Sequence, residues 1–148
     1  MAIRISPLGE EDLFQFSGTG YDGMPPEARR NMLAASEGRQ HRDGHYFEMF
    51  TLKDGETVIG FVNLYAQQPD AVSVGLDIRE PFRRKGYATR AAEPIAALLT
   101  GKGFFCIRTH VRADNEASLR LHEKLGFTCS GRDKTDRGAE VLVFEKRL

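Results

Sequence analysis

The sequence predicts an α+β protein with a mixed β-sheet and helices on both of its faces. Three β-rich runs follow one another with only short turns between them, which indicates an antiparallel meander. An extended run, a helical run and a second extended run come next, which is typical of a crossover between parallel strands. The 148 residues are 41% hydrophobic, so they suffice for one domain that spans residues 1–148.

The chain opens with a strand and a broken segment. Residues 2–6 (AIRIS) alternate as a strand does, and residues 9–16 (GEEDLFQF) carry the acidic first turn that a helix N-terminus favours. Residues 17–26 (SGTGYDGMPP) contain three glycines and two prolines, so we expect a loop. Its two prolines open a helix that ends near Glu37.

The meander is predicted by three strand-forming runs. Residues 45–52 (HYFEMFTL) and 57–65 (TVIGFVNLY) are rich in β-branched and aromatic residues. The Asp-Gly pair within residues 53–56 is a hairpin signal between them. Residues 67–71 (QQPDA) form a second turn, and residues 72–78 (VSVGLDI) place four apolar side chains on one face of a third strand.

The crossover occupies the second half of the chain. Residues 86–99 (GYATRAAEPIAALL) are rich in alanine and leucine and predict a helix. Pro94 lies inside this run, so we expect a kink near Arg90, whose carbonyl loses its helical partner. Residues 104–111 (FFCIRTHV) predict a strand that runs parallel to residues 72–78.

A second helix and a hairpin end the chain. Asn115 or Asp114 caps the helix predicted over residues 115–127, and Gly126 stands where a left-handed C-terminal residue belongs. Residues 127–147 predict a final hairpin.

A cationic cluster surrounds one glycine at the start of the helix over residues 86–99. Its members are Arg83, Arg84, Lys85 and Arg90. The first four N–H groups of a helix have no internal partner and carry partial positive charge, so a phosphate binds well there. Gly86 has no Cβ to obstruct an anion, and Ala88 is small. The string matches neither the P-loop nor the dinucleotide-binding fingerprint.

The charges of the whole chain balance, with 21 Lys and Arg against 21 Asp and Glu. A protein that binds nucleic acid through this cluster is the weaker alternative, because such proteins usually carry a basic excess.

A second motif follows the cationic one in register. It consists of Asn115, Ser118, Lys124, Gly126 and Phe127. Together with the segment Arg83-Arg84-Lys85-Gly86-Tyr87-Ala88, it resembles the motifs of the GNAT superfamily of acyl-CoA-dependent N-acetyltransferases. The detailed resemblance covers about residues 57–131, and the order of elements matches from end to end.

The resemblance implies a three-layer fold whose sheet of about seven strands splays apart between strands 4 and 5. Coenzyme A pyrophosphate then lies on the cationic loop, and pantetheine pairs with the backbone between residues 72–78 and 104–111. The coenzyme-binding residues that it implies are Leu76, Asp77, Ile78, Arg83, Arg84, Lys85, Gly86, Tyr87, Ala88, Thr89 and Asn115. It further implies acetyl-CoA as co-substrate, no metal, and direct transfer to a primary amine of a small molecule or of a peptide or protein N-terminus.

The candidate general acid is His122, which stands where the family usually has the tyrosine of Tyr-x-Lys-x-Gly-Phe. Histidine exchanges protons near pH 7. Asn115, Leu119 and His122 lie at i, i+4 and i+7 and so share one helix face. The alternative is a surface or capping histidine without a chemical role, which fits a regulatory module that binds acyl-CoA without catalysis.

Several further residues remain open. His110 is a candidate general base or an ordinary strand histidine; Glu48 and Asp77 are other candidates. Tyr21 and Asp22 either contact a cationic acceptor or are turn residues.

The remaining predictions concern the setting of the protein. Cys106 and Cys129 lie in apolar stretches, so we expect two buried free thiols. His41 and His45 flank a solvated loop, and no residues have the spacing of metal ligands. No signal peptide or membrane span is visible. We therefore expect a cytoplasmic monomer or homodimer without membrane or nucleic-acid partners.

Overall fold

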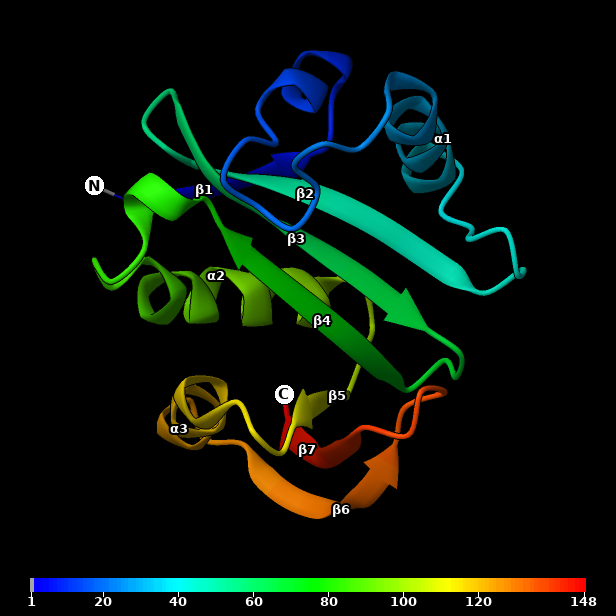
Figure 1. Cartoon of the computed structure of the whole chain (residues 1–148), viewed down its shortest axis with the longest axis vertical. Helices are drawn as coiled ribbons and strands as arrows, with labels where there is room; N and C mark the ends of the chain where they lie inside the picture. The colour runs from blue at the N-terminus through cyan, green and yellow to red at the C-terminus, as the bar shows by residue number, and fades with distance from the viewer. Residues whose placement is uncertain (1) are drawn as a thin grey trace.

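The computed structural model describes residues 2–148, and a seven-stranded sheet forms its centre (Figure 1). The strands are β1 (Ile3–Pro7), β2 (Tyr46–Asp54), β3 (Thr57–Ala66), β4 (Ala71–Ile78), β5 (Cys106–Arg112), β6 (Thr128–Lys134) and β7 (Glu140–Arg147). The α-helices are α1 (Pro26–Glu37), α2 (Tyr87–Gly101) and α3 (Glu116–Lys124). Two short 3₁₀ helices, η1 (Glu10–Phe14) and η2 (Glu80–Phe82), complete the elements.

The sheet is mixed and has the strand order β1-β2-β3-β4-β5-β7-β6. β1 to β4 form the predicted antiparallel meander, and β7 lies between β5 and β6. β4 and β5 are parallel and pair only at Ala71–Cys106 and Val72–Ile107. Beyond these two pairs the strands diverge, which confirms the expected splay.

Local signals set most of the predicted boundaries. Gly55 turns the β2–β3 hairpin at a φ of 63°. The side chain of Asn115 caps α3 by accepting the Ser118 N–H at 3.1 Å, and Gly126 follows the helix at a φ of 90°. α2 runs continuously through Pro94.

Residues 9–16 do not form the predicted α-helix. They form only the 3₁₀ turn η1, whose Asp12 side chain is buried and accepts the Gly9 N–H at 2.8 Å. The same carboxylate oxygen accepts the Thr51 hydroxyl at 2.9 Å. This bond to β2 fixes the segment against the sheet, so tertiary contact decides its shape.

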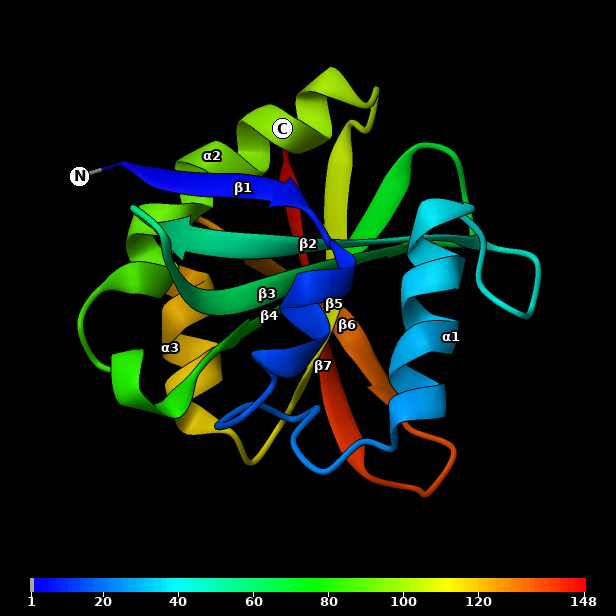
Figure 2. The same ribbon diagram turned by 90° about the horizontal axis from the view of Figure 1, so that it is seen from above.

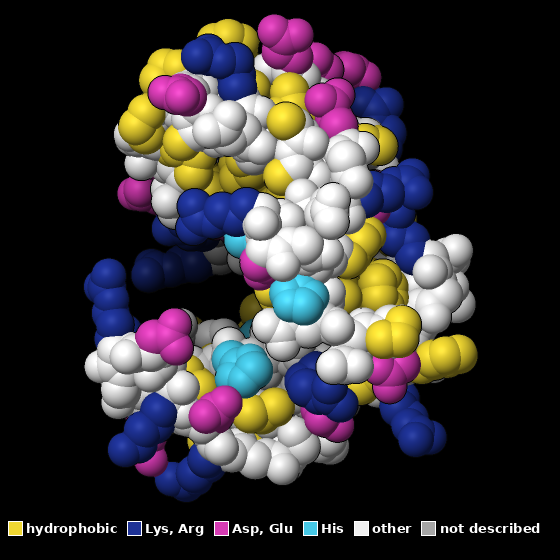
Figure 3. Space-filling view, turned by 90° about the vertical axis from the view of Figure 1, so that its right-hand side faces the viewer, with side chains coloured by type: hydrophobic (Ala, Val, Ile, Leu, Met, Phe, Trp, Pro, Cys, Tyr) yellow, Lys and Arg dark blue, Asp and Glu magenta, His cyan; other side chains and the backbone are white. Residues whose placement is uncertain are grey.

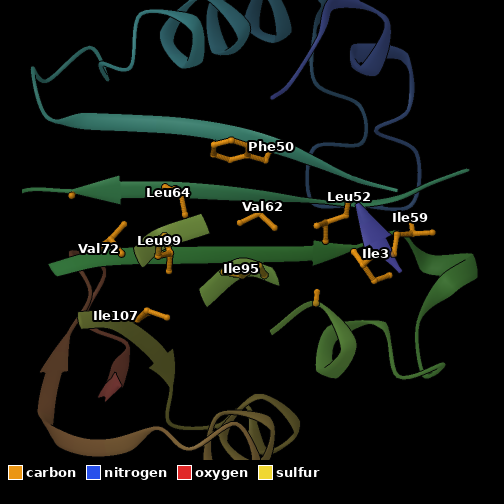
Figure 4. Close-up of a cluster of buried hydrophobic side chains, with 12 residues drawn as sticks. Ile3, Phe50, Leu52, Ile59, Val62, Leu64, Val72, Ile95, Leu99 and Ile107 are labelled. Atoms are coloured by element: carbon orange, nitrogen blue, oxygen red, sulfur yellow. The ribbon is translucent and has the colours of Figure 1, made fainter. Parts of the chain in front are cut away.

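Helices cover both faces of the sheet, with α1 and α2 on opposite sides (Figures 1 and 2). Strand side chains alternate between the two cores because neighbouring residues point to opposite faces. Phe50 and Leu52 belong to the core under α2, which Figure 4 shows, whereas Met49 belongs to the core under α1.

Candidate functional site

A cleft of about 570 Å³ lies where β4 and β5 separate. Its walls come from β4, β5, α2, α3 and the residues that follow α3, with one further residue each from β3 and β7. The lining residues are Asn63, Ser73, Val74, Gly75, Leu76, Ile78, Ala88, Ala92, Ile95, Ala96, Ile107, Thr109, His110, Val111, Ser118, Leu121, His122, Leu125, Phe127 and Lys146. Figure 3 shows the molecule notched between an upper and a lower part, with histidine side chains beside the notch.

The open edge of β4 carries backbone groups without a strand partner. Arg79 donates its N–H to the Ile59 carbonyl of β3 at 2.8 Å. Backbone groups of successive strand residues point to opposite edges, so those of Ile78 and Leu76 point into the gap. By the same alternation the backbone of Asp77 faces β3. Of the three β4 residues in the predicted coenzyme set, two therefore present hydrogen-bonding groups to the cleft.

The N-terminus of α2 lies next to this edge. Gly86 is its N-cap residue and has a φ of 82°, a left-handed conformation that glycine adopts without steric strain. A Cβ built on Gly86 would have no heavy atom within 4 Å, so the space beside it is open. Arg84, two residues earlier, is also left-handed at a φ of 62°. The loop thus turns sharply and leaves the first N–H groups of α2 accessible to an anion.

Tyr87, the first residue of α2, fastens this end of the helix to the β2–β3 hairpin. Its hydroxyl donates to Asp54 Oδ2 at 2.7 Å, and the Arg90 guanidinium lies 5.0 Å from the centre of its ring. The hydrogen bond to Asp54 raises the pKa of Tyr87, because it stabilises the protonated phenol. The other oxygen of the Asp54 carboxylate is buried and has no hydrogen-bond partner within residues 2–148.

The remaining residues of the predicted coenzyme set occupy different surroundings. Ala88 lines the cleft. Arg84, Lys85 and Thr89 are exposed near the α2 N-terminus. Asn115 is exposed at the N-cap of α3 and is outside the cleft lining.

The Arg83 side chain donates hydrogen bonds to the backbone of two other segments. Its Nε–H donates to the Ile78 carbonyl at 2.7 Å, and its Nη2 donates to the Gly18 carbonyl at 3.0 Å. Its guanidinium is therefore engaged by the protein itself.

His122 lies in the cleft wall between two aromatic rings. Its ring centre is 5.0 Å from that of Phe127 and 5.7 Å from that of Phe144. Nδ1 is 2.7 Å from the Ser118 carbonyl oxygen, which can only accept, so Nδ1 carries a proton and donates it. Nε2 is then the nitrogen that remains for chemistry, and it can give up a proton only from the doubly protonated imidazolium.

His110 lies on the face of the sheet opposite His122. It pairs with Val143 in β7, whereas its neighbour Thr109 pairs with Phe144, the residue that His122 contacts. Because adjacent strand residues point to opposite faces, His110 and His122 flank the cleft from opposite sides. His110 is about half exposed, with Nε2 3.7 Å from Asp133 Oδ2.

The other candidate bases have structural partners elsewhere. Glu48 is buried and forms an ion pair with Lys102 at 2.7 Å in a separate pocket at the C-terminal end of α2. Tyr46 donates its hydroxyl to the same carboxylate at 2.6 Å. Asp77 accepts the Gly20 N–H at 2.7 Å, so its carboxylate is committed to the loop over residues 17–22.

That loop uses Tyr21 and Asp22 for its own structure. Asp22 accepts the Gly18 N–H at 3.1 Å, and the Tyr21 hydroxyl accepts from Asn63 Nδ2 at 2.8 Å. Burial, the largest effect, raises the pKa of Tyr21. The hydrogen bonds of Tyr21 and Asp22 agree with the alternative that these two are turn residues.

Asn63, Gly75 and Lys146 are among the residues of the site that the sequence analysis does not identify. Asn63 lines the cleft beside Gly75, where a Cβ would lie 2.7 Å from Asn63 Oδ1. A larger side chain at position 75 would therefore displace this amide. Lys146 also lines the cleft and donates to the Leu125 carbonyl at 2.7 Å. Nothing in the spacing of these residues indicates their proximity, because strand pairing alone brings them together.

The expectation of two buried cysteines is wrong for Cys129. Both thiols are free, but Cys129 is exposed on β6, an edge strand, and Cys106 is partly buried. The apolar stretch around Cys129 ends in a strand whose side chains are largely solvent-accessible.

Two features are absent from residues 2–148. No group of three or more His, Cys, Asp or Glu is arranged to hold a metal ion. None of the helices is both long and apolar enough to span a bilayer. The cytoplasmic setting and the oligomeric state stay predictions.

Comparisons with known proteins converge on one family. A family model described as "Acetyltransferase (GNAT) domain" matches residues 8–128. The uncharacterized N-acetyltransferase YdgE of Bacillus subtilis (strain 168) is 29% identical over 122 residues, which cover 80% of this chain and 70% of that protein.

Solved structures share the fold. An acetyltransferase from Salmonella typhimurium that modifies the N-terminal serine of ribosomal protein L7/L12 has a TM-score of 0.81 at 15% identity, covering 100% of this chain and 96% of its own. A putative acetyltransferase from Salmonella typhimurium, solved with its cofactor acetyl-CoA, has a TM-score of 0.74 at 17% identity, with 100% and 95% covered.

Proposed function

The chain belongs to the GNAT family of acetyltransferases and is an N-acetyltransferase, and we propose that it takes acetyl-CoA into the cleft between β4 and β5. The acetyl group then passes directly to a primary amine. This amine approaches from the face of the sheet that carries His110, opposite His122. The observation that carries this proposal is the placement of His122 and His110 on opposite sides of one cleft.

The cleft suits a long acyl-CoA substrate. Leu76 and Ile78 offer backbone groups along the gap, as a neighbouring strand would, and can pair with the amides of pantetheine. The N-terminus of α2 and the exposed cations Arg84 and Lys85 provide the positive potential that a pyrophosphate requires. Ala88, in the first turn of α2, lines the cleft with a small side chain.

The transfer forms one bond and breaks another. The amine nitrogen attacks the thioester carbonyl carbon, the C–N bond forms, and the C–S bond breaks as the thiolate leaves. A backbone N–H at the open edge of β4, such as that of Ile78, can stabilise the negative charge that develops on the carbonyl oxygen. The proton from the amine goes to His110 or to solvent, and the thiolate takes a proton from Nε2 of the His122 imidazolium.

His110 is proposed as the base because it lies on the face opposite His122. An amine with an ordinary pKa of ~10.4 is almost fully protonated at pH 7, so it must lose a proton before it attacks. Nε2 of His110 lies 3.7 Å from Asp133 Oδ2. His110→Gln should therefore lower the rate at acidic to neutral pH more than at alkaline pH, where the free amine is abundant.

The decisive experiment measures acetyl-CoA turnover with a panel of polyamines, amino acids, aminoglycosides and peptides with free N-termini. A peptide with an N-terminal serine is included because the Salmonella typhimurium neighbour modifies such a residue. Acetylated product identified by mass spectrometry supports the proposal. Thioester hydrolysis without any acetylated amine would favour a module that only binds acyl-CoA.

The role of His122 is then tested with an amine that is a substrate. The wild-type kcat should rise and then fall with pH, because the amine must be neutral and His122 must be the imidazolium. His122→Phe keeps an aromatic ring in the wall and should lose about 10²–10⁴-fold in kcat together with the alkaline fall. His122→Tyr supplies another proton donor and should keep much of the activity. An unchanged profile in His122→Phe would show that the histidine is structural.

A further inference from the structure

The loop over residues 17–22 lies directly against the connection between β4 and α2. The Glu80 N–H donates to the Gly18 carbonyl at 2.9 Å, and the Asp77 carboxylate accepts the Gly20 N–H at 2.7 Å. The two segments are about sixty residues apart in sequence, so the contact is wholly tertiary.

Two glycines permit this close approach. At Gly18, which has a φ of 76°, a Cβ would lie 3.0 Å from the backbone nitrogen of Glu80. At Gly20, a Cβ would lie 3.1 Å from Asp77 Oδ2. Larger residues at these two positions would push the loop away from the connection between β4 and α2. The glycines of the Ser-Gly-Thr-Gly sequence therefore permit this contact as well as the turn.

Arg83 joins the loop to the open edge of β4. Its Nε–H donates to the Ile78 carbonyl at 2.7 Å, and its Nη2 donates to the Gly18 carbonyl at 3.0 Å. The same Nη2 is 3.4 Å from Asp77 Oδ1. A planar guanidinium can hold these three oxygens at once, which a lysine ammonium on a flexible stem does less well.

The loop over residues 17–22 also contacts the face of the sheet that carries His110. This is the acceptor face, from which the amine is proposed to approach. Asn63 donates to the Tyr21 hydroxyl at 2.8 Å and lines the cleft. Asn63 points to the face opposite Val62 and Leu64, which belong to the core under α2. Contacts therefore run without interruption from the Ile78 carbonyl, through Arg83 and residues 17–22, to the side of the cleft where the amine approaches.

We propose that Arg83 is a positioning residue that couples coenzyme binding along β4 to the order of residues 17–22 on the acceptor face. This inference rests on the proposed function, because it needs coenzyme A at the Ile78 edge. Coenzyme bound there fixes the end of β4 and with it the Arg83 side chain. Arg83 and Asp77 then hold Gly18 and Gly20 more firmly, so binding of the acyl donor increases the order of the acceptor side.

The test uses coenzyme A itself as the probe and does not require the acceptor. Calorimetry first measures its affinity, and hydrogen–deuterium exchange then follows peptides that contain residues 17–22 at saturating coenzyme A. In the wild type, coenzyme A should slow exchange of the Gly18 and Gly20 amides by about threefold or more. Arg83→Leu should exchange faster without coenzyme A and should show no such response when it is saturated.

Arg84→Leu is the matched control, since Arg84 is the next residue along and is exposed. It should weaken coenzyme A binding yet keep the exchange response at saturation. Arg83→Lys retains the charge and should respond only partly, which provides a second variant if Arg83→Leu does not fold.

Each outcome of these experiments either supports or overturns a stated part of the proposal. A wild-type loop that does not respond to saturating coenzyme A overturns the coupling and leaves the proposed function intact. A full response in Arg83→Leu, or in Arg83→Lys if the leucine variant does not fold, overturns the role of Arg83. Failure of the wild type to bind coenzyme A at all overturns the proposed function and the coupling together, and calorimetry reveals this before any exchange is measured.

Discussion

Gly86→Asp should weaken coenzyme A binding much more than Gly86→Ala does. Both variants place a side chain at a φ of 82°, and in neither does the Cβ meet a heavy atom within 4 Å. Both therefore lose about 1–2 kcal/mol of stability to the left-handed backbone. That loss is common to the free and the bound protein, so it lowers Tm and largely cancels in Kd. Only aspartate adds a negative charge where the pyrophosphate is proposed to bind.

The expected rise in the Kd for coenzyme A follows from the position of Gly86. Two unit charges 4 Å apart repel by about 1 kcal/mol in water and by about 4 kcal/mol at an effective dielectric constant of 20. Gly86 is exposed, so the lower value applies to each charge. For a pyrophosphate with two charges the total is about 2 kcal/mol, which corresponds to about a 30-fold rise in Kd. Arg90→Ala should change Kd less, since Arg90 lies one turn further along and stacks on Tyr87.

Isothermal titration of coenzyme A into the three folded variants measures these differences. Raising the ionic strength from about 0.05 to about 0.5 M should narrow the gap between Gly86→Asp and Gly86→Ala, because salt screens exposed charges. Equal affinities for these two variants at low salt would refute the assignment of the anion site to the α2 N-terminus.

Three other changes test the structure itself. The Tyr65 hydroxyl is the largest of several effects that lower the pKa of Asp43 from 3.8 to about 2, so Tyr65→Phe should lower the Tm above pH 4, and this deficit should fade as the pH falls to 2. A Tm deficit that persists at pH 2 would rule out this linkage. Leu99 is fully buried in the core under α2, and Leu99→Ala should lower the free energy of unfolding by about 2–5 kcal/mol in urea denaturation. A thiol reagent should modify exposed Cys129 in the folded protein faster than Cys106, and equal rates would contradict their difference in exposure.

Short sequence patterns predict the structure correctly where it depends on interactions between neighbouring residues. Asn115 and Gly126 mark the ends of α3, because capping and left-handed backbone depend on a few neighbouring atoms. The helical run through Pro94 was placed correctly, and the structure adds that α2 continues across the proline. Residues 9–16 were misassigned because a hydrogen bond from Thr51, far away in the sequence, shapes that turn. Cys129 was misassigned because hydrophobic neighbours do not reveal that β6 is an edge strand.

The sequence by itself determined the fold class, the family resemblance and the cationic loop around Gly86, since each of these depends on residue type and short spacing. The tertiary structure decided what the individual side chains do. Strand register places His110 and His122 on opposite faces of one cleft, and a contact across about sixty residues joins the Arg83 side chain to the Gly18 carbonyl. The reason is physical: hydrogen bonds and ion pairs act over a few ångströms, and only the folded chain brings residues distant in sequence to that separation.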